Sequence, residues 1–221
     1  GEANSSADSY YGLGILRSSN GGSSWSSITQ SSDSPVRAFA GMAVSKIVFS
    51  TTNPSLAVAA FAGSALGDIT GLENPITLNR GLYYSQDGGS TWHYATVTDN
   101  GVTVAPGSAT SVIYNAGAGL FFAALRFHGI YSSSDGIHWS RLTTQPSTGL
   151  SLTACPTNPS SSACPIYRGE FASVPGRNEM YLWFVDSSEN DIGIWRTING
   201  GSAWTQIGDS SIKTCGDSFG C

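Results

Sequence analysis

The chain has 221 residues, of which only 11% are charged, and a formal net charge of −5. So few charges, with Gly, Ser and Thr in every segment, favour short strands and tight turns over helices, whose exposed faces usually carry Glu, Lys and Arg. The basic residues are spread along the chain, which argues against a nucleic-acid partner. The most apolar stretches, 56–62 and 119–125, are strand-sized, so we expect no membrane insertion.

The four cysteines form two close pairs, Cys155 with Cys164 and Cys215 with Cys221. Such spacing suits disulfides that staple loops in an oxidising compartment, which predicts an extracellular or periplasmic protein. The alternative is a zinc site, but there is no CxxC pair and no histidine near these cysteines. We therefore expect no metal, and no nucleotide or dinucleotide motif indicates a cofactor.

Four segments of the chain superpose as one repeated motif. They cover residues 14–25, 81–92, 129–139 and 193–204, and each begins with Gly followed by Ile or Leu and ends in Trp. The third copy is one residue shorter than the others, and the first and fourth copies carry Asn where the second and third carry Asp.

Each copy is predicted to fold as strand, turn and strand. The Asp or Asn side chain accepts hydrogen bonds from backbone N–H groups just ahead of it, and a Ser or Thr two residues earlier bonds across the turn. The Gly supplies a positive φ, and the Trp starts the return strand and buries its ring against the neighbouring sheet. The motif positions are Ser18, Asn20, Gly22 and Trp25; Ser85, Asp87, Gly89 and Trp92; Ser133, Asp135, Gly136 and Trp139; and Thr197, Asn199, Gly201 and Trp204.

This pattern, Ser-x-Asp-x-Gly-x-x-Trp, resembles the Asp-box or BNR repeat. The repeat occurs in sialidases, sortilin ectodomains, xyloglucan-cleaving glycosidases, a photosystem assembly factor and bacterial secreted proteins. The resemblance covers nearly the whole chain. It implies an all-β fold, a β-propeller of four-stranded blades in which each motif is the turn between the third and fourth strands.

Two further strand-like runs precede each of the last three motifs. They are residues 40–50 and 56–62, 109–115 and 120–126, and 168–174 and 179–185. We expect one propeller segment over residues 1–221. Its parts are a partial blade at 1–36, blades at 37–104, 105–146 and 147–208, and a tail or the start of another blade at 209–221.

That count gives about three and a half to four blades, whereas propellers close with about four to eight. We therefore expect part of a larger propeller; a four-bladed ring completed by the last strands is the alternative. The chain opens without a recognisable signal peptide, which fits either a mature form or an excised piece.

Strands alternate in direction, so the four motif turns are expected on one face of the disc and the connections between blades on the other. The resemblance implies that ligands bind on that second face and that the motif carboxylates are structural. The insertions 62–80 and 142–166 and the opening segment 1–11 belong to the second face. The candidate ligand-binding residues there are Arg37, Tyr167, Arg168 and Glu170, for which a surface salt bridge and an edge aromatic are the alternative interpretation.

A glycosidase needs two carboxyl groups about 5–9.5 Å apart, and Glu170 and Asp191 are the catalytic candidates. Residues 34–37 come nearest to the arginine motif of sialidases and do not match it. We therefore predict a non-catalytic extracytoplasmic scaffold that binds a protein or polysaccharide on the loop face. The alternatives are a fragment of a xyloglucanase-like or sialidase-like glycoside hydrolase and an assembly factor for a membrane complex. The sequence does not fix the oligomeric state.

Overall fold

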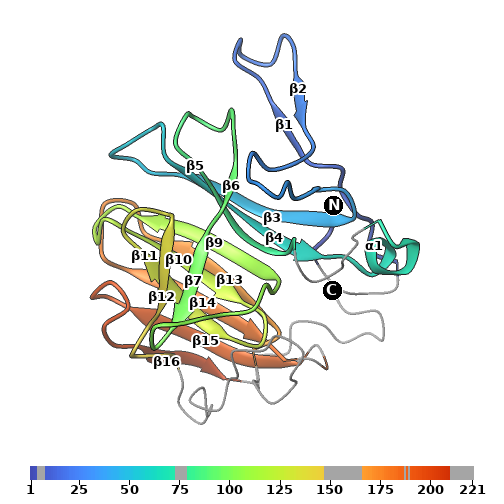
Figure 1. Ribbon diagram of the computed structural model, residues 1–221. Coiled ribbons are helices and arrows are strands. Elements are labelled where there is room, and N and C mark those ends of the chain that lie inside the picture. Colours follow the sequence, from blue (N-terminus) through green and yellow to red (C-terminus); the bar gives the residue numbers. More distant parts are fainter. Residues whose placement is uncertain (4–7, 73–78, 147–165, 187, 189, 210–221) are drawn as a thin grey trace.

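The structure is a computed structural model that describes residues 1–3, 8–72, 79–146, 166–186, 188 and 190–209 (Figure 1). All four cysteines, and with them the predicted disulfides, lie outside the described residues, as does the tail from 210 onward. The described part is built of strands, and its one helix is α1 (Ala65–Thr70). No helix in this part is long and apolar enough to cross a membrane.

Three antiparallel meanders follow one another along the chain and confirm the predicted strands. The second blade is β3 (Met42–Phe49), β4 (Ala57–Gly63), β5 (Gly81–Ser85) and β6 (His93–Tyr94). The third is β9 (Ala109–Asn115), β10 (Leu120–Leu125), β11 (Gly129–Ser133) and β12 (His138–Arg141). The fourth is β13 (Arg168–Ser173), β14 (Met180–Val185), β15 (Asp191–Thr197) and β16 (Thr205–Asp209).

The blades stack with their first strands side by side. Ser45 Oγ of β3 donates to the Ala109 carbonyl of β9 over 2.9 Å, and Thr110 Oγ1 donates to the Gly169 carbonyl of β13 over 3.1 Å. A Cβ on Gly169 would lie 2.8 Å from the Ala124 Cβ, so glycine permits this close approach. The inner strands of the third blade lie between two sheets and are apolar on both faces, and all seven residues of β4 are buried.

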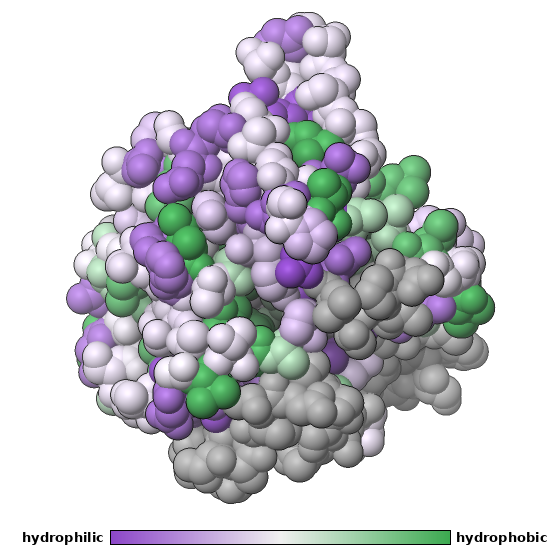
Figure 2. All heavy atoms as spheres, viewed as in Figure 1, coloured by the Kyte–Doolittle hydropathy of each residue, from purple (hydrophilic) through white to green (hydrophobic). Residues whose placement is uncertain are grey.

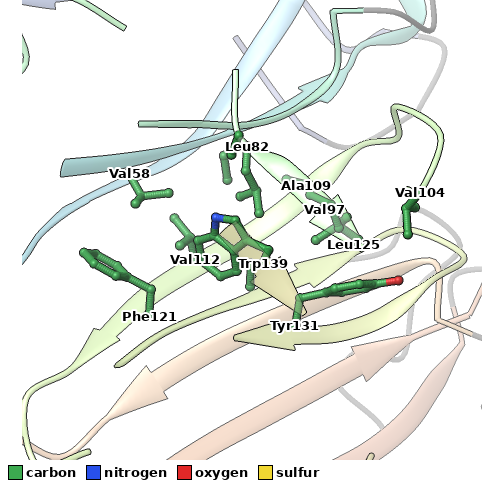
Figure 3. Packing of buried hydrophobic residues seen from close by; sticks show 13 residues of the cluster. Val58, Leu82, Val97, Val104, Ala109, Val112, Phe121, Leu125, Tyr131 and Trp139 are labelled. Carbon is green, nitrogen blue, oxygen red and sulfur yellow. The ribbon is translucent and has the colours of Figure 1, made fainter. Parts of the chain in front are cut away.

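The hydrophobic core fills the spaces between successive blades. Figure 3 shows Val58 and Leu82 of the second blade facing Trp139, Val112 and Phe121 of the third. The next interface, between the third and fourth blades, is centred on the aromatic residues Phe122, Phe184 and Trp195. Each blade is therefore stabilised mainly by its neighbours.

The first motif forms a two-stranded hairpin, β1 (Ile15–Arg17) with β2 (Ser26–Ile28), which projects from the blades in Figure 1. Ile15 packs on the second blade and is 7% exposed. The expected burial of the first motif's tryptophan is wrong: Trp25 is 61% exposed, whereas Trp92 and Trp139 are each 1% exposed. No described strand lies beyond β1 to cover that ring.

Two short strands lie where the sequence analysis did not place them. β7 (Thr96–Asp99) pairs in parallel with β12, and β8 (Val102–Thr103) pairs with β7. The third sheet thereby has six strands in the order β8-β7-β12-β11-β10-β9. Residues 96–103, assigned above to the span of the second blade, thus join the edge of the third.

Candidate functional site

The four motif turns share one hydrogen-bond pattern. In the second copy, the Gly89 amide donates to Ser85 Oγ over 2.8 Å, and the Thr91 amide donates to Asp87 Oδ1 over 2.9 Å. Gly89 holds a φ of +82°, which a residue with a side chain rarely adopts. The Trp92 indole then donates to the Gly89 carbonyl over 3.2 Å and fixes the ring on the turn.

The two copies with asparagine close in the same way. In the first copy the Ser24 amide donates to Asn20 Oδ1 over 2.9 Å, and in the fourth the Ala203 amide donates to Asn199 Oδ1 over 2.9 Å. The turn therefore uses the side-chain oxygen as an acceptor and does not require a negative charge.

The two motif carboxylates are held ionised by the turn. The backbone hydrogen bond from Thr91 is the main cause that lowers the pKa of Asp87 to about 2. Desolvation opposes ionisation of Asp135, but hydrogen bonds from the His138 ring, the His138 amide and the Ile137 amide outweigh it and lower the pKa of that carboxyl. Acids with such low pKa values are poor general acids at neutral pH.

Arginines from three blades lie on the face opposite the motif turns. Arg80 directly precedes β5, Arg126 directly follows β10 and Arg168 begins β13, and these strand ends all lie on that face. The charges of Arg80 and Arg168 act on Arg126: burial lowers the pKa of Arg126 most, and the two neighbouring cations lower it further.

Arg126 and Tyr167 form the centre of this arginine cluster. The Arg126 guanidinium carbon lies 4.1 Å from the Tyr167 ring centroid, and Nε donates to the Tyr167 carbonyl over 3.2 Å. Nη2 also donates to the carbonyl of Ala3, over 3.3 Å, so the opening segment is tied to the same place. Arg168 lies beside them, with its guanidinium carbon 6.0 Å from the Trp183 ring centroid.

Arg37 contacts the outer strand of the second blade. Its guanidinium carbon lies 4.1 Å from the ring centroid of Tyr94 on β6. Burial raises the pKa of Tyr94, whose hydroxyl donates to the Arg80 carbonyl over 2.6 Å. Arg37 is thus linked to the arginine cluster through Tyr94.

The acids on this side are bound by donors from the protein itself. Asp68 of α1 forms an ion pair with Arg80. Glu170 Oε1 accepts from Lys46 Nζ over 2.6 Å and from Ser111 Oγ over 3.2 Å. Asp191 Oδ1 accepts from the Trp183 indole over 2.7 Å. Among the described residues no group of three or more His, Cys, Asp or Glu side chains is placed to hold a metal ion.

Glu170 and Asp191 lie on different strands of the fourth blade. Glu170 on β13 stands opposite Trp183, Asp191 on β15 stands opposite Val185, and β14 separates them. Two strand spacings put their backbones roughly 10 Å apart, before the offset along the strands. Each carboxylate is hydrogen-bonded to a separate donor, Glu170 to Lys46 and Asp191 to the Trp183 indole.

Sequence analysis did not find Arg80, Arg126, Lys46 or Trp183. A signal existed for the first two, because an arginine flanking a predicted strand at its loop-face end points toward that face. Lys46 lies within β3, and its contact with β13 depends on how the blades stack, which no local pattern encodes.

No protein-family model matches the chain, and no curated protein matches it. Solved structures do. The fold matches that of an ancestral GH74 enzyme with a TM-score of 0.53 at 16% identity, over 88% of this chain and 23% of that one. YCF48 from Cyanidioschyzon merolae matches with a TM-score of 0.42 at 18% identity, over 76% of this chain and 37% of that one. The GH74 xyloglucanase from Xanthomonas campestris matches with a TM-score of 0.40 at 15% identity, over 72% of this chain and 18% of that one.

The chain has a β-propeller fold. It spans less than a quarter of the length of the GH74 enzyme it matches. At 16% identity the likeness concerns the fold alone, so the activity has to be argued from the side chains described above.

Proposed function

We propose that this propeller is a non-catalytic, extracytoplasmic binding module of the Asp-box type. Its ligand is a partner that carries carboxylate groups, with an acidic polysaccharide as the preferred class, and binds on the face opposite the motif turns. The observation that carries the proposal is geometric: Arg126 stacks on the Tyr167 ring and Arg168 follows it beside Trp183, whereas Glu170 already binds Lys46 and Asp68 already binds Arg80.

The chemistry of this face suits an acidic sugar chain. A guanidinium binds a carboxylate through two parallel hydrogen bonds, and an aromatic ring offers a flat apolar surface to a sugar ring. Tyr167, Arg168 and Trp183 are each half-buried, so their side chains remain within reach of a ligand. Burial keeps Arg126 fixed, which orients the Tyr167 ring.

The test measures binding of the full chain to polygalacturonate and to a neutral polysaccharide of similar length. We expect the acidic polymer alone to bind, with an affinity that falls as salt rises. Arg168→Ala should lower that affinity at least about tenfold, because a hydrogen bond to a charged group contributes about 1.5–3 kcal/mol. Arg177→Ala, on the opposite face with its side chain 65% exposed, is the matched control and should leave binding unchanged.

Equal binding of both polymers, or equal effects of the two substitutions, would contradict the proposal. Binding to a protein partner but to no glycan would favour an assembly role instead. Arg168→Ala then reports whether that partner binds on the loop face, because only a ligand bound there loses affinity in this variant.

The second candidate is part of a glycoside hydrolase, favoured by the fold match to the ancestral GH74 enzyme. Glu170 and Asp191 would then be the acids. Release of reducing sugar from xyloglucan, abolished in Glu170→Gln, would support this candidate and refute the non-catalytic one. Absence of release together with acidic-glycan binding is the result that we expect.

A further inference from the structure

The dipeptide Asn-Gly occurs three times in the chain, each time in a turn between two strands. Asn20 and Asn199 are the side-chain acceptors of the first and fourth motif turns. Asn100 lies elsewhere, in the two-residue turn that joins β7 to β8. Asparagine before glycine is chemically labile, because glycine has no side chain to hinder attack of its nitrogen on the asparagine amide. The structure gives the three sites different surroundings.

The turn between β7 and β8 leaves both reacting groups unoccupied. Asn100 has a φ of +49° and Gly101 a φ of +79°, the left-handed pair of a type I′ hairpin turn. Both residues are exposed. No described residue forms a hydrogen bond with the Asn100 side chain or with the Gly101 amide. The side-chain carbonyl carbon and the nitrogen that would attack it are therefore adjacent in the chain and open to water.

This turn can also change conformation without disturbing the blade. β8 is held by two residue pairs, Thr98 with Thr103 and Asp99 with Val102. Val102 is 59% exposed and Thr103 is exposed as well, so burial does not fix β8 in place. Such an edge strand opens locally at little cost. The Asn100 side chain can then rotate toward the Gly101 nitrogen while β7 stays paired with β12.

The motif turns hold their asparagines in place. Asn20 Oδ1 accepts from the Ser24 amide over 2.9 Å and from Ser18 Oγ over 3.0 Å, and Nδ2 donates to Ser24 Oγ over 2.8 Å. Asn199 Oδ1 accepts from the Ala203 amide over 2.9 Å. Both asparagines are exposed, and Figure 2 shows the first hairpin standing out from the body of the molecule. Hydrogen bonding, and not access to water, therefore distinguishes these two sites from Asn100.

We propose that Asn100 deamidates spontaneously in the folded protein, whereas the motif turns protect Asn20 and Asn199. The Gly101 nitrogen loses its proton to hydroxide and bonds to Asn100 Cγ. The bond from Cγ to Nδ2 breaks, and Nδ2 takes a proton from water and leaves as ammonia. Water then opens the resulting succinimide at either carbonyl, which gives aspartate or isoaspartate. In total the chain takes up one water molecule and releases one ammonia.

The isoaspartate product would alter the edge of the third sheet. Its main chain runs through the side-chain carbon, which adds a methylene group to a turn of two residues. It also places a carboxylate beside Asp99, whose own carboxylate already pairs with Arg141 over 2.9 Å. A two-residue hairpin turn does not tolerate the longer main chain, so β8 should separate and leave the outer edge of β7 unpaired.

The test follows all three sites in one sample. The full chain is kept in mildly alkaline buffer, and peptide mapping by mass spectrometry measures the conversion of each Asn-Gly site with time. Asn100 should react at least about tenfold faster than Asn20 or Asn199, because the loss of two hydrogen bonds corresponds to about that factor. The same chain in urea is the reference, in which the three sites should react at similar rates.

Ser18→Ala tests the cause of the protection. It removes the hydrogen bonds of Ser18 Oγ to Asn20 Oδ1 and to the Gly22 amide. Conversion of Asn20 should then become about fivefold faster. Asn100 in the same molecules is the internal control and should keep its rate. Asn100→Gln should abolish the isoaspartate signal of its turn, because the longer side chain closes the ring far more slowly.

Two results would overturn the proposal. One is equal conversion of the three asparagines in the folded chain, which would mean that the hydrogen bonds of the motif turn give no protection. The other is conversion of Asn100 at least about tenfold slower in the folded chain than in urea, which would mean that its own turn protects it too.

Discussion

At the scale of single residues, the motif turn depends on an oxygen acceptor two residues after a hydroxyl. Asn20 and Asp87 accept from the amide four residues ahead over the same distance, 2.9 Å, although only one of them is charged. The carboxylate of Asp87 also accepts from Thr91 Oγ1 over 2.7 Å, a contact that uses its second oxygen. In the first copy Asn20 Nδ2 fills this role by donating to Ser24 Oγ over 2.8 Å, so what the charged copies add is a dependence on pH.

Substitution of Asp87 separates these contributions. At pH 7, Asp87→Ala should lower the free energy of unfolding by about 1–2 kcal/mol, as loss of a comparable cap does, and Asp87→Asn by less. The folded pKa, about 2, lies below the ordinary value of 3.8, so the stabilisation by the charge is present above about pH 4 and is lost as the pH falls toward 2. Urea unfolding at pH 7, 4 and 3 should show the gap between wild type and Asp87→Asn closing on acidification; a constant gap would contradict this account.

At the scale of elements, the strands followed from the repeated motif and from turn chemistry, because each run lies between recognisable Gly, Asn or Pro turns. β7 was not predicted although Asp99, Asn100 and Gly101 mark its turn with β8. A turn signal shows that two strands pair with each other but not which sheet edge receives them. Likewise Ser64 caps α1 by accepting from the Gly67 amide over 3.1 Å, a signal hidden inside what reads as an insertion.

The four tryptophans occupy equivalent sequence positions but are packed differently, and this is testable. Trp139→Ala should lower the free energy of unfolding by about 3–5 kcal/mol, because it removes a ring buried between two blades. Trp25→Ala should change it by less than about 0.5 kcal/mol, because that ring is mostly exposed. Denaturant unfolding followed by circular dichroism measures both, and similar losses would mean that Trp25 is covered in solution.

At the scale of the whole molecule, the face that carries Arg126 and Tyr167 is assembled from residues that are distant along the chain. The position of Arg168 at the start of a strand followed from the sequence, and Tyr167 directly precedes it. The contact of Tyr167 with Arg126 could not be predicted, since it arises only when the third and fourth blades stack. The same holds for Lys46, which reaches past β9 to Glu170 and to the Phe171 carbonyl, 3.1 Å away.

The contact between Lys46 and Glu170 links the second blade to the fourth. Their side chains are 32% and 39% exposed, so water screens the pair substantially. A double-mutant cycle with Lys46→Met and Glu170→Gln should give a coupling energy of about 0.5–1 kcal/mol that shrinks in high salt. A coupling of zero at low salt would show that the blades hold together without it.

The parallel pairing of β7 with β12 also constrains the order in which strands can pair during synthesis. During synthesis β7 leaves the ribosome before any strand of the third blade exists, and its partner β12 is the last strand of that blade to be made. The second blade can therefore complete its meander first. The backbone of β7 remains without its partner β12 until the whole third blade has been synthesised. Residues 96–103 therefore reach their place in the third sheet only after its strand β12 has been made.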